Sequence, residues 1–238
     1  MNPAEAVISE HEFASVPRNY RKGALPTWHQ RRRHRAILGL LKGLNGRVLD
    51  YGCGYGDLTY AMSQTHPASG VDLDPVRVAF ARREYAPLEF QLCDPRDAPF
   101  PDESFDIVTS VVVLNFIADA QAHLRSIRRM LRSGGHLILA YQNQFRVRNA
   151  VRRLLGRGPV PSDLWMRSRD EVLGLVENEG LRLIRESHFY DPPSDARRRP
   201  GDLLVGTLLQ ICSALQIRAT ADYLILVAQK TDSIPSES

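Results

Sequence analysis

Residues 48–59 of this 238-residue chain read Val48-Leu49-Asp50-Tyr51-Gly52-Cys53-Gly54-Tyr55-Gly56-Asp57-Leu58-Thr59. A short apolar strand ends in an acidic residue, three glycines follow at alternate positions, and a helix capped by Asp57 begins. Glycine reaches positive φ freely and has no side chain, so a ligand can lie directly on the backbone amides of such a turn. The third glycine comes one residue too early for a Gly-x-Gly-x-x-Gly fingerprint, and no Lys-Ser/Thr follows as in a P-loop. The stretch predicts a cofactor-binding turn of another kind.

Outward from this turn, apolar runs typical of strands alternate with helical segments. We expect strands at 46–51, 69–73, 89–92, 107–112, 136–141, 181–190 and 222–230. A helix over 119–131 should be closed by the glycines at 134 and 135, and Ser168 with Glu171 should form a capping box for a helix that reaches 179. The alternation indicates an α/β protein with a doubly wound, mainly parallel sheet.

Acidic residues follow the second and third predicted strands. Asp72 ends the second strand about twenty residues after Asp50, the spacing at which a βαβ unit brings an acid to a ribose. Asp94 ends the third strand and precedes Pro95. Each acid could instead be a helix cap or a turn former.

Four linked motifs between residues 46 and 141 resemble those of the class I (Rossmann-like) S-adenosylmethionine (SAM)-dependent methyltransferases that act on small molecules. Residues 48–56 are similar to the family's Val-Leu-Asp-x-Gly-Cys-Gly-x-Gly motif, and the acid at 72 follows in the family's order. Residues 99–106, Pro-Phe-Pro-Asp-Glu-Ser-Phe-Asp, resemble its segment before strand four, and residues 129–135, Arg-Met-Leu-Arg-Ser-Gly-Gly, its segment before strand five. The resemblance implies a seven-stranded sheet whose last strand is antiparallel.

The same resemblance implies which residues bind SAM, or its product S-adenosylhomocysteine (SAH). Asp50 would order the glycine turn, and the methionine part of SAM would lie on the turn itself. Asp72, with Leu73 beside it, would bind the ribose, and Asp94-Pro95 the adenine. Val111 would lie near the reacting end, and Tyr20 could close over the cofactor. The residues implied on the turn are Gly52, Cys53 and Gly54; we interpret Cys53 as a small packing residue and not as a nucleophile.

The acceptor side of the reaction is less determined. A general base helps when a neutral hydroxyl is the nucleophile. Many relatives have histidine shortly after strand four, whereas this chain has Val113-Leu114-Asn115-Phe116, and Asn115 cannot accept a proton. Because ligands gather at the carboxyl ends of strands in open α/β sheets, we take Tyr141 and His188 as the candidate catalytic residues.

The chain divides into an N-terminal arm and helix at 1–45, a cofactor-binding domain at 46–230 and a disordered tail at 231–238. Seven basic residues and no acidic one lie within 18–35, either on the solvated face of a helix or as an anion-attracting rim. An insertion at 191–221 contains an apolar helix at 203–217, which could pack on the domain, line an acceptor pocket, contact a membrane surface or form a homodimer.

Composition excludes several other classes. Hydrophobic residues at 43% and charged residues at 24% are ordinary globular values, and a net charge of +4 does not demand an anionic partner. Three cysteines without a C-x-x-C pair suggest neither disulfides nor a metal site. The start lacks signal-peptide features and the 203–217 run is too short to span a membrane. We expect a cytoplasmic protein.

The sequence therefore predicts a SAM-dependent methyltransferase that acts on a small organic acceptor. Oxygen is favoured as the nucleophilic atom, and the acceptor could be apolar or lipid-like. The arginine runs leave open an RNA methyltransferase, although the Asp/Asn-Pro-Pro-Tyr/Phe motif of DNA amino-methyltransferases is missing after strand four. Asn115 leaves open a third reading, a non-catalytic partner protein that retains the SAM fold.

Overall fold

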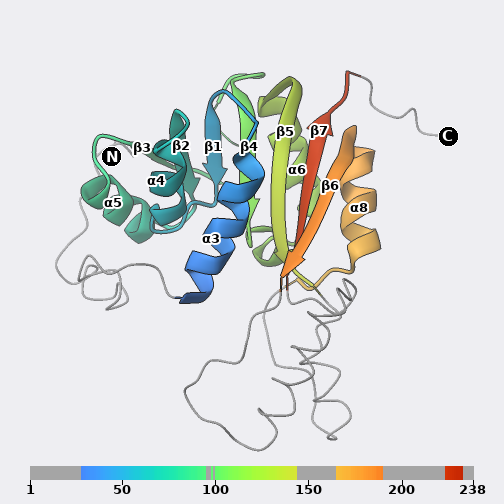
Figure 1. Cartoon of the computed structure of the whole chain (residues 1–238), viewed down its shortest axis with the longest axis horizontal. Coiled ribbons are helices and arrows are strands. Elements are labelled where there is room, and N and C mark those ends of the chain that lie inside the picture. Colours follow the sequence, from blue (N-terminus) through green and yellow to red (C-terminus); the bar gives the residue numbers. More distant parts are fainter. Residues whose placement is uncertain (1–27, 95–97, 99, 144–164, 190–222, 233–238) are drawn as a thin grey trace, which may run out of the picture.

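The computed structural model describes residues 28–94, 98, 100–143, 165–189 and 223–232. Seven strands form one sheet in the order β3-β2-β1-β4-β5-β7-β6 (Figure 1). They are β1 (Val48–Tyr51), β2 (Ala68–Asp72), β3 (Glu89–Leu92), β4 (Phe105–Val111), β5 (Leu131–Gln142), β6 (Leu181–Phe189) and β7 (Tyr223–Lys230). Strand β7 pairs antiparallel with both β5 and β6, and the other pairings are parallel. The predicted doubly wound sheet with an antiparallel last strand is confirmed.

Helices cover both faces of this sheet. They are α3 (Trp28–Leu41), α4 (Asp57–Ser63), α5 (Pro75–Glu84), α6 (Ala120–Met130) and α8 (Arg169–Asn178), together with the short 3-10 helix η2 (Leu114–Phe116). No helix among the residues that the structure describes is long and apolar enough to cross a membrane.

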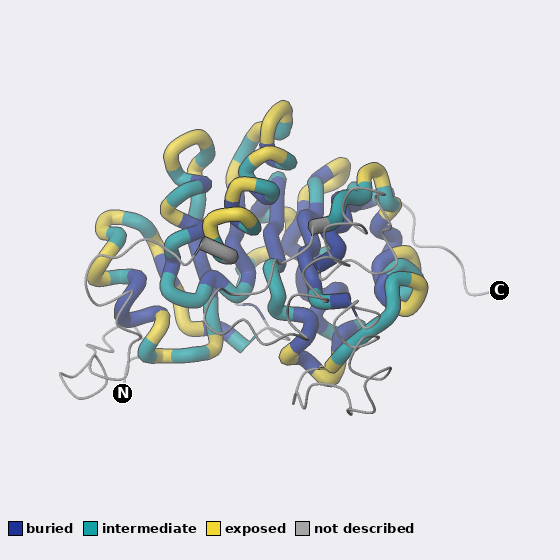
Figure 2. The backbone as a smooth tube through the Cα atoms, turned by 60° about the horizontal axis from the view of Figure 1, so that its bottom comes forward, coloured by how far each residue is buried: buried dark blue, intermediate teal, exposed yellow. Residues whose placement is uncertain are grey.

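The core lies on either side of the central strands because successive residues of a strand point to opposite faces. Val48 and Ile107 pack with Ile37 of α3 and Met62 of α4. Their chain neighbours pack on the other face against α6 and α8, in a cluster that includes Leu49, Val108, Leu124, Ile127, Val172 and Val176. Figure 2 shows this buried interior in dark blue beneath the more exposed helices.

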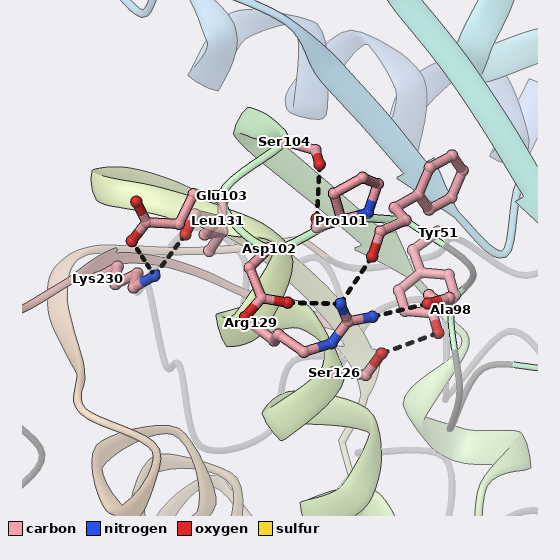
Figure 3. Close-up of polar contacts among 11 residues, drawn as sticks. Tyr51, Ala98, Pro101, Asp102, Glu103, Ser104, Ser126, Arg129, Leu131 and Lys230 are labelled. Carbon is pink, nitrogen blue, oxygen red and sulfur yellow. Dashed lines mark hydrogen bonds and ion pairs between the residues drawn. The ribbon is translucent and has the colours of Figure 1, made fainter.

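Two predicted motifs form a single structural unit at the amino ends of β4 and β5. The guanidinium of Arg129 donates to the carbonyl oxygens of Ala98 and Phe100, both at 2.7 Å, and to the Asp102 carboxylate at 2.8 Å (Figure 3). Nearby, the Lys230 ammonium donates to the Leu131 carbonyl at 2.6 Å and to Glu103 at 3.1 Å. Residues 98, 100 and 102 are thus held by the end of α6.

Two helix ends differ from the expectation. Asp57 is the first residue of α4, and the N-cap is Gly56, at φ +85°, which has no side chain to make a cap hydrogen bond. Helix α6 ends at Met130, because Leu131 is extended, fully buried and paired with Phe105 of β4. Gly134, at φ +71°, therefore lies within β5 and does not close the helix. The capping box of Ser168 and Glu171 is confirmed.

Several expectations fall outside the described residues. They concern Tyr20 and most of the N-terminal arm, Pro95, the 191–221 insertion with its apolar helix, and nearly all of the tail. These remain predictions.

Candidate functional site

A cavity of about 710 Å³ opens at the carboxyl ends of β1, β2 and β4. This is where ligands bind in open α/β sheets, at the point where the strand order reverses. Its wall includes the glycine turn, the ends of β2 and β4, residues of α3 and the segment after β4. Of the residues proposed for the cofactor, the wall contains Asp50, Gly52, Cys53, Gly54, Asp72, Leu73 and Val111.

The glycine turn is fixed from β2. The backbone N–H groups of Gly52 and Cys53 both donate to the Val71 carbonyl at 2.8 Å. Gly52 has φ +90°, and a Cβ there would lie 2.1 Å from Cγ2 of Val113. The turn can therefore pass beneath the β4 segment only because this position has no side chain.

The Asp72 carboxylate clasps the turn. One oxygen accepts from the Gly54 N–H at 2.8 Å, and the other accepts from the Asp74 N–H at 3.0 Å. Each carboxylate oxygen can accept a further hydrogen bond, and the residue is half-buried on the cavity wall. Asp72 is thus turned toward the glycine turn and retains capacity for a ligand.

Asp50 supports the site from beneath. Its side chain is buried, and its two oxygens accept from the hydroxyls of Thr59 at 2.7 Å and Thr109 at 2.9 Å. Burial raises the pKa of Asp50 to about 6, although the two hydroxyl hydrogen bonds oppose the shift. The carboxylate therefore ties β1 to α4 and β4.

Asp94, the residue expected at the adenine, does not line the cavity, and Cys53 is a buried thiol. Cys93 lines the cavity, whereas its neighbour Asp94 is not among the lining residues; the Asp94 carbonyl accepts from the Tyr51 hydroxyl at 3.3 Å. Burial raises the pKa of the Cys53 thiol well above its usual value, which keeps it protonated and disfavours a nucleophilic role.

The structure does not bring Tyr141 or His188 to the cavity. Tyr141 is fully buried in the core cluster on the α6 and α8 face, and its hydroxyl has no hydrogen-bond partner within the described ranges. Burial also raises its pKa above the usual value. His188 lies in β6, the edge strand of the sheet, where it pairs with Leu224 of β7. Strands β7 and β5 separate His188 from β4. The geometry gives no support to their proposed catalytic roles.

Sequence reasoning missed a polar group at one end of the cavity, formed by Arg33 and His34 of α3 and Asp57 of α4. The Arg33 Nε and one Asp57 carboxylate oxygen are buried and have no hydrogen-bond partner among the described residues, and that oxygen lies 3.5 Å from His34 Nδ1. Burial raises the pKa of Asp57 to about 6; burial and the Arg33 charge lower the pKa of His34 to about 4. At neutral pH a carboxylate and a guanidinium therefore flank a neutral imidazole. The basic run at 18–35 was the available signal.

No group of three or more His, Cys, Asp or Glu side chains in the described part of the chain is arranged to hold a metal ion.

Comparison with known proteins identifies similar chains. Residues 49–139 match the family model described as "Methyltransferase domain". The chain is 30% identical over 185 residues to a ubiquinone biosynthesis O-methyltransferase of Rhizobium rhizogenes, covering 71% of this chain and 73% of that one. It is 35% identical over 99 residues to the phthiotriol/phenolphthiotriol dimycocerosates methyltransferase of Mycobacterium leprae, covering 40% of this chain and 37% of that enzyme's length.

A solved structure shares the fold. A Haloferax volcanii methyltransferase, determined in complex with the Trm112 methyltransferase activator, superimposes with a TM-score of 0.67 at 22% identity. The likeness covers 94% of this chain and 97% of the other.

Proposed function

Because the chain belongs to the class I SAM-dependent methyltransferases, we propose that it binds SAM in the cavity at the glycine turn and transfers the methyl group to a small organic acceptor. The observation that supports this best is the turn itself, a side-chain-free bend at Gly52 whose Gly54 amide is bound to the Asp72 carboxylate.

The residues of the cavity fit this cofactor at both ends. Asp72 has lone pairs left for ribose hydroxyls, and Leu73 beside it is 60% exposed on the cavity wall, where an adenine ring could cover it. At the other end, buried polar atoms without partners are costly, so a ligand that pairs them is favoured. Arg33 would bind the cofactor's carboxylate and Asp57 its ammonium group.

The chemistry requires positioning more than proton transfer. When bound, SAM supplies a methyl group on a positively charged sulfur, which is a strong electrophile. The protein has to hold the acceptor in line with that sulfur and exclude water. At the end of β4 and in the segment after it, the cavity wall is apolar and consists of Val111, Val112, Val113, Phe116 and Ile117. An apolar wall supports the proposal of an apolar or lipid-like acceptor.

We favour oxygen as the atom that is methylated because one relative is named an O-methyltransferase, and its alignment with this chain covers 73% of that relative's length. We also propose a cytoplasmic location, since Cys53 and Cys93 are buried thiols that form no disulfide in the described part of the chain. An acceptor in RNA and a purely regulatory SAM-binding role are the competing proposals.

One experiment separates these proposals. Calorimetry would measure SAM and SAH affinity, and methyl-labelled SAM would then be incubated with protein and a cell lysate that is afterwards divided into organic-solvent and RNA fractions. Label in the organic fraction supports the proposal, label in RNA supports the nucleic-acid alternative, and binding without labelled product supports a regulatory role.

The control for this experiment is Gly54→Arg. Gly54 lines the cavity at φ +56°, a left-handed conformation, and a Cβ there would meet no atom within 4 Å. We expect arginine at this position to strain the turn and to occupy space that the cofactor needs. The variant should lose cofactor binding and labelling together. Failure of the wild-type protein to bind SAM or SAH would overturn the cofactor proposal.

A further inference from the structure

The segment after β4, residues 112–118, forms the apolar wall of the cavity in an unusual conformation. Val112 has φ +64°, a left-handed conformation that a β-branched residue adopts only under strain. Its N–H donates to the Ala140 carbonyl at 2.7 Å, and the next residue, Val113, covers Gly52. Strain of this kind persists where surrounding contacts impose it, often at functional sites.

Asn115 is one of these surrounding contacts. It is 1% exposed, and its amide nitrogen donates to the carbonyls of Gln142 and Trp165, each at 3.2 Å. Its amide oxygen accepts from the Gln142 N–H at 2.8 Å, and its backbone carbonyl accepts from the Trp165 N–H at 2.7 Å. Asn115 therefore acts as a structural clamp between the segment after β4 and residues 142 and 165.

Arg167 fixes the other side of the same segment. Its guanidinium donates to the carbonyls of Leu114 at 2.7 Å, Ile117 at 2.8 Å and Ala118 at 3.0 Å. A planar fork with five N–H donors can bind several carbonyls at once, whereas a lysine cannot reproduce that arrangement. Helix η2 is thus held by hydrogen bonds from two separate side chains.

The segment 112–118 leaves the aromatic ring of Phe116 exposed at the cavity. Phe116 lines the cavity and is nonetheless 69% exposed, while its neighbours Leu114 and Asn115 are buried. A single exposed apolar residue is common on protein surfaces. Here, however, the exposed ring coincides with a strained backbone, a double clamp and the wall of the proposed cofactor site.

We propose that Phe116 is the residue that recognises the acceptor, by contact of its ring with an apolar ring or chain of that molecule. Ile117 extends the contact, and Asn115 and Arg167 are positioning residues that hold the ring at the cavity. This inference rests on the proposed function and adds to it the part of the acceptor that is bound. A ring held in place in advance loses little conformational freedom when the acceptor arrives.

The test uses 2-naphthol, an apolar phenol, titrated calorimetrically with and without SAH. The Phe116→Ala variant should weaken naphthol binding by about tenfold or more, since it removes a large apolar contact, and leave SAH affinity within about twofold. Phe116→Leu should restore most of the naphthol affinity. The matched control is Ile184→Ala, because Ile184 is 46% exposed on β6 and does not line the cavity.

A double-variant cycle tests the positioning role. Arg167→Lys should weaken naphthol binding several-fold in the wild-type background and have little further effect when Phe116 is already alanine. If Arg167→Lys lowers naphthol affinity equally in the wild-type and Phe116→Ala backgrounds, its effect is a general destabilisation of the fold, and the positioning role of Arg167 is wrong.

The outcomes also separate this inference from the proposed function. If the wild-type protein does not bind SAH, the cofactor proposal fails whatever naphthol does. If naphthol does not bind up to millimolar concentration, or binds Phe116→Ala as tightly as wild type, the assignment of Phe116 fails even when SAH binds normally.

Discussion

Gly52 is subject to two constraints, a φ of +90° and a neighbouring Val113 methyl group at 2.1 Å from the place of a Cβ. Val113 is β-branched and stiff, so a larger residue at position 52 has to displace the backbone of the turn. We expect Gly52→Ala to lower SAH affinity at least about tenfold, as measured by calorimetry.

The matched control is Gly39→Ala in α3. A Cβ at position 39 would meet nothing within 4 Å, and its backbone is helical. The Gly39→Ala variant should bind SAH as tightly as the wild type, and its free energy of unfolding should be higher by about 0.5–1 kcal/mol. Equal SAH affinity for the Gly52 and Gly39 variants would contradict the role of the turn.

The polar group at the α3 end of the cavity predicts opposite pH effects for two of its members. Asp57 has a pKa of about 6 instead of its ordinary 3.8, so the folded protein holds that proton more tightly than the unfolded chain. The Asp57 contribution to the free energy of unfolding therefore falls as the pH rises from about 4 to about 6. His34, with its pKa lowered from 6.5 to about 4, makes a contribution that rises between about pH 4 and 6.5.

Urea unfolding at pH 4 and pH 6.5 measures both contributions. Relative to wild type, Asp57→Asn should gain stability on the order of 2–3 kcal/mol between these pH values, and His34→Gln should lose a similar amount. A difference from wild type that stays constant with pH in either variant would show that the group does not titrate as inferred.

At the scale of elements, Arg129 joins α6 to the segment before β4 through three acceptors. Lysine has one ammonium in place of a planar fork and would leave carbonyls without their partner. We expect Arg129→Lys to lower the free energy of unfolding by about 1–3 kcal/mol in urea titration. Arg31→Lys, at an exposed position of α3, should stay within about 0.5 kcal/mol. Equal stability of the two variants would rule out the clamp.

The elements themselves could be predicted from the sequence because their signals are local. Apolar runs and glycines located all seven strands, and the Ser168 capping box began α8 where it was expected. The end of α6 could not be predicted in this way, since Leu131 leaves the helix to pair with Phe105, 26 residues earlier in the chain. Glycine at 134 was a sound local signal that a tertiary contact overrode.

The site divides along the same line. Asp50, Gly52 and Asp72 lie at the carboxyl ends of β1 and β2, so sequence spacing predicted that they would meet. Arg33 and Asp57 meet because α3 packs beside α4, which no spacing encodes. Tyr141 follows the rule for strand ends, yet strand alternation turns it into the core; His188 is displaced to the sheet edge by the antiparallel β7.

For the whole molecule, the cavity joins α3, α4 and three strands, so cofactor binding should stabilise the entire fold. With SAH at about 100 times its dissociation constant, the gain should be about 2.7 kcal/mol, which raises the melting temperature by roughly 5–10 °C for a chain of this size. Differential scanning fluorimetry would measure this rise.

The matched variants for this measurement are Asp72→Ala and Asp170→Ala. Removing Asp72 should abolish most of the SAH-induced rise, because that carboxylate holds the glycine turn. Asp170, whose side chain is 91% exposed on α8, should leave the rise unchanged. A rise that survives in Asp72→Ala would place the cofactor elsewhere.

A backbone bridge between Asn143 and Arg167 brings together the two points where the chain leaves β5 and returns to α8. The intervening stretch therefore starts and finishes at a common anchorage, and that anchorage also holds the Phe116 turn through Arg167. Because residues 143 and 167 are bridged, we expect a substitution or insertion in the stretch between them to leave the glycine turn undisturbed.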